Sequence, residues 1–424
     1  MPLPGQPQRL FSQGRGQARR RPGPDLILWG VPVLITLLAG VLIASTQRAS
    51  NLADWENHWI TGAVGLGAAV LLSRVDLQRL EQLLVPVYGL TIVSLVAVRA
   101  VGTSALGAQR WISIGGLHVQ PSEFAKLAAI LLLAGMLARQ PIEKPADMLR
   151  PLGVILVPWA LVFIQPDLGT SLVFGAISLV MLFWSGLTLP WLLLLISPLP
   201  TAIVAGTVQP LLIPWFAGLT VLAWRSLPWK RLGVAVVLAV NSLFAVLTPY
   251  LWSHGLKDYQ KDRLVLFLDP SKDPLGGGYH LIQSRIGIGS GELLGTGLMR
   301  GHLTKLQFIP EQHTDFIFSA MGEETGFVGC MLLLLLYGAL SWKLLQIAGR
   351  ARTDFESLVV IGVLAMLVFQ IVINISMTIG LGPVTGIPLP WMSYGRFAML
   401  VNFLCIGLVA SVQRRSQRGD PFRR

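Results

Sequence analysis

The sequence predicts an all-α, polytopic membrane protein of about twelve membrane-spanning helices, and three observations support this fold class. The chain has 424 residues, of which 53% are apolar and only 13% are charged, whereas a soluble protein carries about 25% charged residues. The apolar residues form long uninterrupted blocks, not the alternating or amphipathic patterns of soluble strands and helices. The basic residues gather in every second segment between these blocks.

The apolar blocks delimit the spans when they are measured against a hydrocarbon core about 30 Å thick. The first block follows residues 1–25, an Arg-, Gly- and Pro-rich stretch that we expect to be a disordered basic tail. Because this block has full membrane-spanning length, we interpret it as a span and not as a cleavable signal. Residues 26–412 are expected to form one membrane domain, and residues 413–424 a second basic tail. The candidate spans are residues 26–45, 58–73, 84–101, 122–138, 151–165, 168–186, 190–206, 210–224, 232–250, 316–342, 357–380 and 392–412.

The distribution of charge orients the chain. If the N-terminus lies in the cytoplasm and the spans alternate, the cytoplasmic segments hold 21 of the 33 Lys and Arg residues but 8 of the 21 Asp and Glu residues. Such a basic excess on one side is what the positive-inside rule demands. We therefore expect both termini in the cytoplasm and a basic face that meets anionic lipid head groups, with no nucleic-acid partner. The cytoplasmic segments are residues 1–25, 74–83, 139–150, 225–231, 343–356 and 413–424.

The cysteines and histidines form no disulfide or metal pattern. Cys330 and Cys405 lie in apolar blocks, where a thiol behaves as a small apolar group. All six histidines fall on the outer side and no two have the spacing of zinc ligands, so we expect no metal site. The histidines are His58, His118, His254, His280, His302 and His313.

The longest polar segment, residues 251–315, is predicted to be a large outer loop. Loops of this length usually carry function. The loop ends at Asp315, where polar residues give way to the apolar run Phe316-Ile317-Phe318. Two interpretations of Asp315 stay open: a helix N-cap, or a general base whose pKa is raised by partial desolvation.

Three further acids lie within or between apolar blocks. Glu323 and Glu324 fall about 12 Å into the helix that follows Asp315, where they need a structural ion pair or a water-filled cavity. Asp167 follows Gln165-Pro166 between two blocks. Since proline ends a helix and Asp is a favoured cap, we expect Asp167 to cap the next helix.

Two polar motifs flank the glycine-rich segment between the third and fourth spans. Arg110 and Trp111 precede it, and Glu123 and Lys126 follow it. Glu123 and Lys126 are three residues apart, so they project from one face of a helix. They form either an ion pair that neutralises the helix end, or a site in which Lys126 binds a phosphate and Glu123 orients its amine.

Taken together, the outer polar residues predict a cavity. Glycine and proline interrupt the backbone at residues 380–390, and such backbone at membrane depth lines a protein cavity. Lys126 and Arg285 are suited to bind a phosphate there, and Asp315 to accept a proton. The ligand that fits is an amphiphile with a charged head and a long tail, and an enzyme and a transporter of such a lipid need the same groups.

These motifs resemble the SEDS family (shape, elongation, division and sporulation), which includes RodA and FtsW. The resemblance covers most of residues 26–412, and residues 278–284 are closer to the RodA branch than to FtsW. Its landmarks are Arg110-Trp111-Ile112, residues 120–126, residues 165–170, Asp269-Pro270, Asp273-Pro274-Leu275-Gly276, residues 283–291, residues 313–318 and residues 386–394.

The resemblance implies a SEDS-type helical bundle in the bacterial cytoplasmic membrane, with the activity of a peptidoglycan glycosyltransferase that polymerises lipid II during cell elongation. The family's essential acid aligns with Asp315, which would deprotonate the 4-hydroxyl of an acceptor sugar. Attack on the donor then inverts its anomeric carbon and releases undecaprenyl diphosphate. That leaving group needs positive charge and not a proton, so Lys126 and Arg285 fit this second role. A divalent cation, Mg²⁺ or Mn²⁺, is an open alternative.

The resemblance also implies partners and a set of site residues. A class B penicillin-binding protein, a transpeptidase, is expected beside other membrane proteins of the elongation complex. The head group would meet Lys126, Glu123, Arg285, Trp111 and Arg110, and the cavity around Asp315 would be built by Asp167, Glu323, Glu324, Ser393 and Tyr394.

The chain departs from the family pattern in two places. Family members have about ten spans, so we expect residues 188–224 to be an inserted helical hairpin. The last motif usually reads Ser-Tyr-Gly-Gly-Ser, whereas this chain has Ser393-Tyr394-Gly395-Arg396-Phe397. Two other functions stay open: a lipid II flippase, which would place its ionisable groups near the middle of the membrane, and a non-catalytic scaffold for a penicillin-binding protein.

Overall fold

The computed structural model describes residues 25–46, 54–105, 108–115, 117–140, 142, 145–165, 167–255, 266–267, 269–274, 278–309 and 311–417. The tail expected at residues 1–25 lies outside these ranges except for Asp25. Asp25 accepts hydrogen bonds from the backbone N–H groups of Ile27 and Leu28 and so caps the first helix. At the other end the last helix continues to Gln417, so the basic tail predicted from residue 413 begins later, and residues 418–424 lie outside the description.

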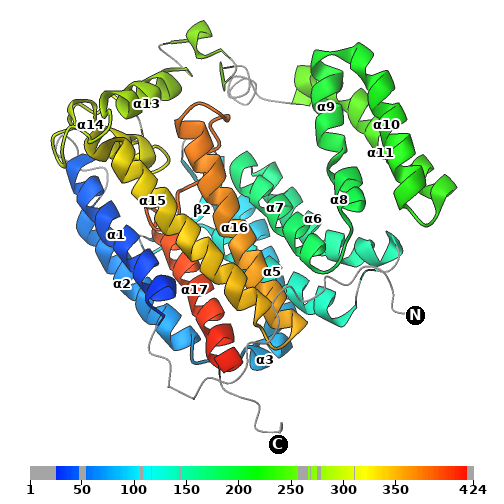
Figure 1. Cartoon of the computed structure of the whole chain (residues 1–424), viewed down its shortest axis with the longest axis horizontal. Helices are drawn as coiled ribbons and strands as arrows, with labels where there is room; N and C mark the ends of the chain where they lie inside the picture. The colour runs from blue at the N-terminus through cyan, green and yellow to red at the C-terminus, as the bar shows by residue number, and fades with distance from the viewer. Residues whose placement is uncertain are drawn as a thin grey trace, which may run out of the picture.

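All twelve predicted apolar blocks are helical in the described chain (Figure 1). The block at residues 190–206 is divided after Ser197, because Pro198 follows and proline cannot donate the N–H that a continuing helix needs. The helices of the twelve blocks are α1 (Leu26–Thr46), α2 (Trp55–Leu72), α4 (Leu84–Val101), α5 (Pro121–Arg139), α6 (Leu149–Ile164), α7 (Leu168–Trp184), α8 (Leu189–Ile196), α9 (Pro198–Thr207), α10 (Leu212–Ser226), α11 (Lys230–Tyr250), α15 (Ile317–Gly349), α16 (Asp354–Thr378) and α17 (Arg396–Gln417).

Eight helical stretches of the described chain are long and apolar enough to cross a membrane, so this is a multi-pass membrane protein. The apolar helices α6 and α7 are shorter, α10 has 15 residues, and α2 carries Glu56 in its first turn. The count of twelve spans therefore stays a prediction. The eight stretches are Leu26–Thr46, Glu81–Ala100, Pro121–Arg139, Leu189–Gly206, Lys230–His254, Ile317–Gly349, Asp354–Thr378 and Arg396–Gln417.

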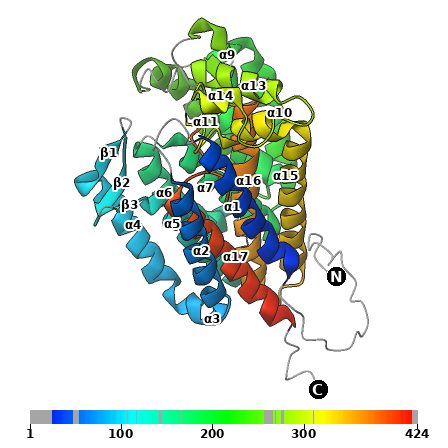
Figure 2. The ribbon, with the colours of Figure 1, turned by 90° about the vertical axis from the view of Figure 1, so that its left-hand side faces the viewer.

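Helix α16 lies at the centre of the main bundle. It packs against α5, α7 and α15, and most of its side chains are buried. Around it, α17 packs along α2, and α1 packs against α2 and α15. Figures 1 and 2 show these helices side by side, and their facing surfaces form one continuous apolar core.

Helices α8 to α11 form a separate group beside the main bundle (Figure 1). Helix α11 packs against α9 and α10, and the group has its own small core around Leu194, Leu219 and Ala223. The range 188–224, predicted to be an inserted hairpin, holds the divided block α8–α9 and most of α10, and α11 packs with them. Its status as an insertion relative to the family stays a prediction. The sequence showed only where apolar blocks ended, not which blocks would pack together.

The short connections gather at the two ends of the bundle. Between α4 and α5 lies a three-stranded antiparallel sheet that the all-α prediction did not include, made of β1 (Thr103–Ala105), β2 (Ala108–Ile114) and β3 (Leu117–Val119). Figure 2 shows this sheet and helices α13 (Tyr279–Ser290) and α14 (His302–Lys305) toward one end, with α3 (Leu77–Leu80) at the other. The predicted alternation of the spans requires this separation.

The predicted outer loop, residues 251–315, is partly helical. Its described part contains α13 and α14, a π-helical turn at Leu251–Gly255 and a 3-10 turn at Pro270–Lys272. Residues 256–265 and 275–277, which include part of the glycine-rich motif, lie outside the description. The hydroxyl of Ser284 on α13 donates a 2.6 Å hydrogen bond to the carbonyl of Thr378 and also pairs with the hydroxyl of Ser319. These bonds fix α13 to both α15 and α16.

Helix α15 is interrupted near its start. Gly326 has φ +64° and ψ −167°, a conformation that side-chain-bearing residues rarely adopt. A side chain here would collide with the backbone of Leu293 and Gly295. The break separates a short segment, residues 317–325, from the long membrane helix, so the segment after Asp315 is packed inside the outer region.

Candidate active site

Asp315 lies directly before α15 and is partly exposed. The helix begins at Ile317 with Phe316 in the N-cap position, so the interpretation of Asp315 as the helix cap is wrong. Its carboxylate faces the irregular segment 380–395: a Cβ built on Gly386 would lie 3.4 Å from Oδ2 of Asp315. Gly386 has φ +72°, which favours glycine, and no side chain crowds the carboxylate from this position.

The backbone of residues 313–315 is held by three hydrogen bonds to its carbonyl groups. The first carbonyl accepts from the backbone N–H of Tyr394 at 2.8 Å, and the second from the hydroxyl of Ser393 at 2.7 Å. The third, that of Asp315, accepts from the side-chain amide of Asn374 at 2.8 Å. Because backbone and not side-chain groups are used, the position of Asp315 is fixed without engaging its carboxylate in these bonds.

Ser393 and Tyr394 therefore lie beside Asp315, where the sequence predicted a cavity wall. Ser393 also accepts a 2.7 Å hydrogen bond from the backbone N–H of Leu389, which ties the irregular segment to itself. The Tyr394 ring packs between two imidazoles, with ring centroids 6.4 Å from His58 and 6.2 Å from His313.

Asp167 caps α7, as the sequence predicted. Its Oδ1 accepts a hydrogen bond of 3.1 Å from the backbone N–H of Thr170. Arg110 of β2 approaches the same carboxylate, with 3.8 Å between Nη1 and Oδ1. Successive residues of a strand point to opposite faces, so the side chain of Trp111 points away from the face on which Arg110 approaches Asp167.

The start of α7 also touches the segment that faces Asp315. A Cβ on Gly169 would collide with the backbone carbonyl of Thr385. Gly169 thus allows α7 to approach residues 385–387 closely. Residues 385–387 therefore contact the start of α7, where Asp167 of the Arg110–Asp167 pair lies, and also face Asp315.

Glu123 and Lys126 form the predicted i,i+3 ion pair, with Nζ donating to Oε1 at 2.8 Å. Both side chains are buried, Lys126 at 1% exposure. A direct contact of Lys126 with a phosphate stays a prediction, and it requires local opening of this part of the structure. Beside the pair, Phe124 packs against Phe397 with ring centroids 6.0 Å apart, so one residue of the departing motif supports helix packing.

Arg285 is the accessible cation of the predicted head-group set. It is exposed on α13, and it has neither a hydrogen bond nor an ion pair to any residue that the structure describes. Its aliphatic stem lies against Gly380 at the end of α16, where a Cβ would be 3.0 Å from Cδ. Its guanidinium is therefore available to an anion at the outer end of the bundle.

Glu323 and Glu324 are buried, and backbone N–H groups donate hydrogen bonds to both carboxylates. Oε1 of Glu323 accepts from Leu303 N at 2.8 Å, and Oε2 from Thr304 N at 2.9 Å. Oε2 of Glu324 accepts from Met299 N at 3.0 Å. The two carboxylates thus order the loop around α14. They lie before the break at Gly326, not within a continuous membrane helix as the sequence predicted.

His313 lies two residues before Asp315 and half-buried. Burial lowers the pKa of His313 below its ordinary value of 6.5, although the Glu311 carboxylate acts in the opposite direction. The imidazole is therefore neutral at neutral pH and does not compete as a cation for Asp315.

Comparison with known proteins decides the family. The model of the cell cycle proteins FtsW, RodA and SpoVE matches residues 25–213 and 206–418, which together cover nearly the whole chain. The chain belongs to this family. The resemblance inferred from the SEDS motifs is thereby confirmed.

Relatives within the SEDS family include two named as peptidoglycan glycosyltransferases. MrdB of Escherichia coli is 38% identical over 390 residues, which cover 90% of this chain and 92% of MrdB. RodA of Treponema pallidum is 33% identical over 90% of this chain and 97% of RodA. Stage V sporulation protein E of Bacillus subtilis is 29% identical over 94% and 99%.

Solved structures of SEDS relatives share the fold. A chain from a study of how a peptidoglycan synthase complex coordinates polymerisation and crosslinking has 30% identity and a TM-score of 0.70, and covers 93% of this chain and 99% of its own. The rod shape determining protein RodA of Thermus thermophilus has 27% identity and a TM-score of 0.61, with 93% and 98% covered.

Asn374 is the site residue that the sequence reasoning missed. Its amide donates to the carbonyls of both Asp315 and Ile387, each at 2.8 Å. Its signal was a polar residue inside the apolar block 357–380, which is costly in a membrane helix unless it has a function. In the described ranges, no group of three or more His, Cys, Asp or Glu side chains could hold a metal ion.

Proposed function

We propose that this chain, a peptidoglycan glycosyltransferase of the elongation type, polymerises lipid II with Asp315 as its general base. Its family, and relatives named for this activity at up to 38% identity among those described above, support the reaction class. The position of Asp315 supports the assignment of the base.

The reaction balances as an inverting substitution. The Asp315 carboxylate takes the proton of the 4-hydroxyl of the acceptor sugar, whose oxygen attacks the anomeric carbon of the donor. The bond from that carbon to the diphosphate oxygen breaks, and its electron pair leaves with undecaprenyl diphosphate. Since a diphosphate is a stable anion at neutral pH, it needs no second acid, unlike the leaving group of an inverting glycosidase.

Cationic side chains stabilise the departing diphosphate in this proposal. Arg285 is the first candidate because it is exposed and unpaired among the described residues. The side chain of Arg110 is 20% exposed and lies 3.8 Å from the Asp167 carboxylate. Lys126 would bind the diphosphate only after it separates from Glu123.

The charge distribution and one solved relative suggest where the chain acts and with which partner. The basic segments orient both termini toward the cytoplasm, so the Asp315 region faces the outer leaflet, where a class B penicillin-binding protein would crosslink the product. A solved relative was studied within a peptidoglycan synthase complex that couples polymerisation to crosslinking, which supports such a partner.

The single observation that carries the proposal is the placement of the Asp315 carboxylate. Asp315 is partly exposed just before α15, in a segment whose backbone is held by Asn374, Ser393 and Tyr394, and its Oδ2 faces Gly386, which has no side chain. A fixed and accessible carboxylate is the arrangement that a general base needs.

Polymer formation from labelled lipid II tests the proposal. The full chain, purified with its cognate penicillin-binding protein, is expected to give glycan polymer on a gel, and Asp315→Asn to give none. Glu292→Gln is the matched control, since Glu292 is an exposed carboxylate at the same end of the bundle. Polymer made by Asp315→Asn at the rate of the control would remove Asp315 from the mechanism, and lipid II translocation in vesicles without polymer would favour a flippase.

A further inference from the structure

A stretch of unbalanced positive charge lies at the corner between α10 and α11. Residues 168–257 contain no Asp or Glu, yet Arg225, Lys230 and Arg231 fall within seven residues of one another. All three side chains are exposed, and none forms an ion pair or hydrogen bond with a residue of the described chain. The three positive charges thus have no acidic residue in their own stretch of the sequence.

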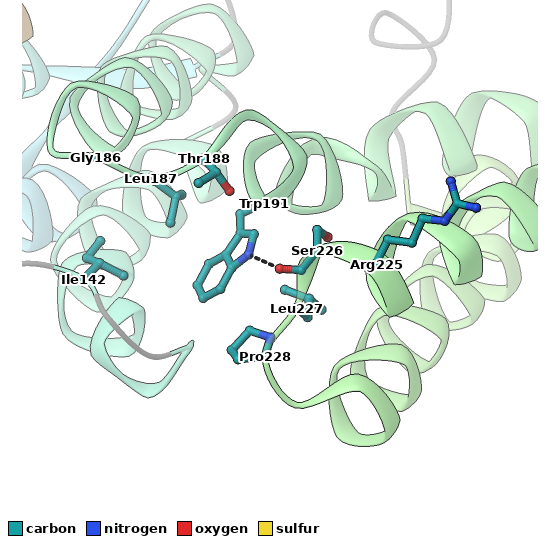
Figure 3. A pocket seen from close by; sticks show the side chains of 9 residues that line it. All are labelled: Ile142, Gly186, Leu187, Thr188, Trp191, Arg225, Ser226, Leu227 and Pro228. Carbon is teal, nitrogen blue, oxygen red and sulfur yellow. Dashed lines mark hydrogen bonds between the residues drawn. The ribbon is translucent and has the colours of Figure 1, made fainter. Parts of the chain in front are cut away.

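A pocket that Arg225 helps to line opens between the α7–α8 corner and the end of α10. Figure 3 shows its lining, and its volume is about 460 Å³. The indole of Trp191 donates a 3.0 Å hydrogen bond to the carbonyl of Ser226, which joins the two sides (Figure 3). The residues that line it are Ile142, Gly186, Leu187, Thr188, Trp191, Arg225, Ser226, Leu227 and Pro228.

The polar and apolar groups of the pocket are arranged at different depths. Arg225 stands at the rim, with its guanidinium directed away from Trp191 (Figure 3), while isoleucine, leucine and proline side chains line the interior. Thr188 precedes α8 without capping it through its side chain, so the positive end of that short helix also faces this corner.

Two exposed tryptophans flank Lys230 and Arg231 in the sequence or in space. Trp224 and Trp229 are 47% and 48% exposed, and the amine of Lys230 lies 5.9 Å from the Trp224 ring centroid in a cation–π contact. Exposed tryptophans beside Lys and Arg mark the head-group region of a bilayer. Leu189, 59% exposed, continues the apolar surface from the corner along α8.

We propose that this corner is a binding site for the head group of an anionic phospholipid, such as phosphatidylglycerol. Arg225, Lys230 and Arg231 bind the phosphate and head group at the rim, and the apolar pocket takes the glycerol and upper acyl region. A free phosphate ion would contact the cations but not the apolar lining of the pocket. An acidic protein segment would likewise not need an apolar pocket beside the cations. The site is independent of the proposed reaction, since none of its residues belongs to the Asp315 region.

Lipid selectivity of the full chain tests this site. Protein released from nanodiscs with equal phosphatidylglycerol and phosphatidylethanolamine is examined by native mass spectrometry, and the wild type is expected to retain phosphatidylglycerol preferentially. The triple variant R225Q/K230Q/R231Q is expected to lose this preference, by about fivefold for each neutralised cation near the surface. R225K/R231K keeps the charge and is expected to keep the preference.

A second triple variant separates a local site from general attraction to a basic face. Arg74, Arg350 and Arg352 are also exposed, lie on the same predicted side, and have no ion pair among the described residues. R74Q/R350Q/R352Q removes the same charge, and its lipid preference is expected to stay near that of the wild type. Equal losses in the two triple variants, or no loss in the first, would overturn the proposal.

Discussion

The side-chain amide of Asn374 donates a 2.8 Å hydrogen bond to the backbone carbonyl of Asp315. The same nitrogen donates to the carbonyl of Ile387, also at 2.8 Å. One buried residue on the central helix thus joins the segment that carries the proposed base to the irregular segment that faces it. Asn374 is therefore a positioning residue, which acts on the reaction through Asp315.

Replacing Asn374 by leucine is expected to lower kcat with little change in KM. The substitution removes the Asn374 donor from a buried carbonyl, that of Ile387, at about 1–3 kcal/mol, and from the part-buried carbonyl of Asp315, whose backbone it releases. Gln370→Leu is the matched control, because Gln370 is equally buried one turn earlier on α16 and bonds neither carbonyl. Equal kcat values for the two variants in the lipid II polymerisation assay would contradict the positioning role.

Replacing Arg285 by glutamine is expected to reduce polymerisation by about 10- to 100-fold, the effect of losing one charged hydrogen bond to the leaving group. Thermal stability should not change, since Arg285 is exposed and has no partner in the described chain. Arg300→Gln removes an exposed charge from the same outer region and serves as the control. If Arg285→Gln turns over as fast as this control, Arg285 does not contact the diphosphate.

Lowering the pH is expected to reduce stability through His313. Because burial places the pKa of His313 below 6.5 in the folded protein, the unfolded chain binds a proton first as the pH falls. The neutral imidazole therefore lowers the stability of the folded protein only below about pH 6.5, where the unfolded chain becomes protonated. The melting temperature, measured from about pH 7.5 down to about pH 5, is expected to fall over this range. His313→Gln should flatten the decline, and an equally steep decline in that variant would assign it to other groups.

Replacing Glu323 by glutamine is expected to destabilise the region around α14. Glu323 accepts from the N–H groups of Leu303 and Thr304 and from the Thr304 hydroxyl at 2.6 Å. Loss of the charge from bonds of this kind costs about 2–4 kcal/mol in total. Hydrogen exchange at residues 299–305 should rise in Glu323→Gln and not in Glu292→Gln. Unchanged exchange would show that the buried carboxylate does not order this loop.

The helices could be predicted because a membrane imposes long apolar blocks, and each of the twelve blocks is helical. Their association could not be. Whether α11 packs with α9 and α10 depends on side-chain fit between distant segments, and block boundaries hold no such information. The break at Gly326 was also hidden, because glycine occurs in continuous membrane helices as well, and only contact with Leu293 and Gly295 requires its left-handed conformation.

The parts of the site that depend on residues close together in the sequence could be predicted. The Asp167 cap and the Glu123–Lys126 pair follow from spacing on one helix turn. The role of Asn374 was not predictable, because its two acceptors lie 59 and 13 residues away in the sequence. For the same reason the sequence could not show that backbone donors bind Glu323, or that Lys126 is buried.

Binding and turnover of lipid II, measured together on Asp315→Asn, test whether Asp315 is the general base. The amide has the size of the carboxylate but cannot take a proton. We expect lipid II affinity to be retained while single-turnover polymerisation falls by about 10²- to 10⁴-fold, the usual contribution of a general base. Polymerisation at the wild-type rate, with binding intact, would contradict it.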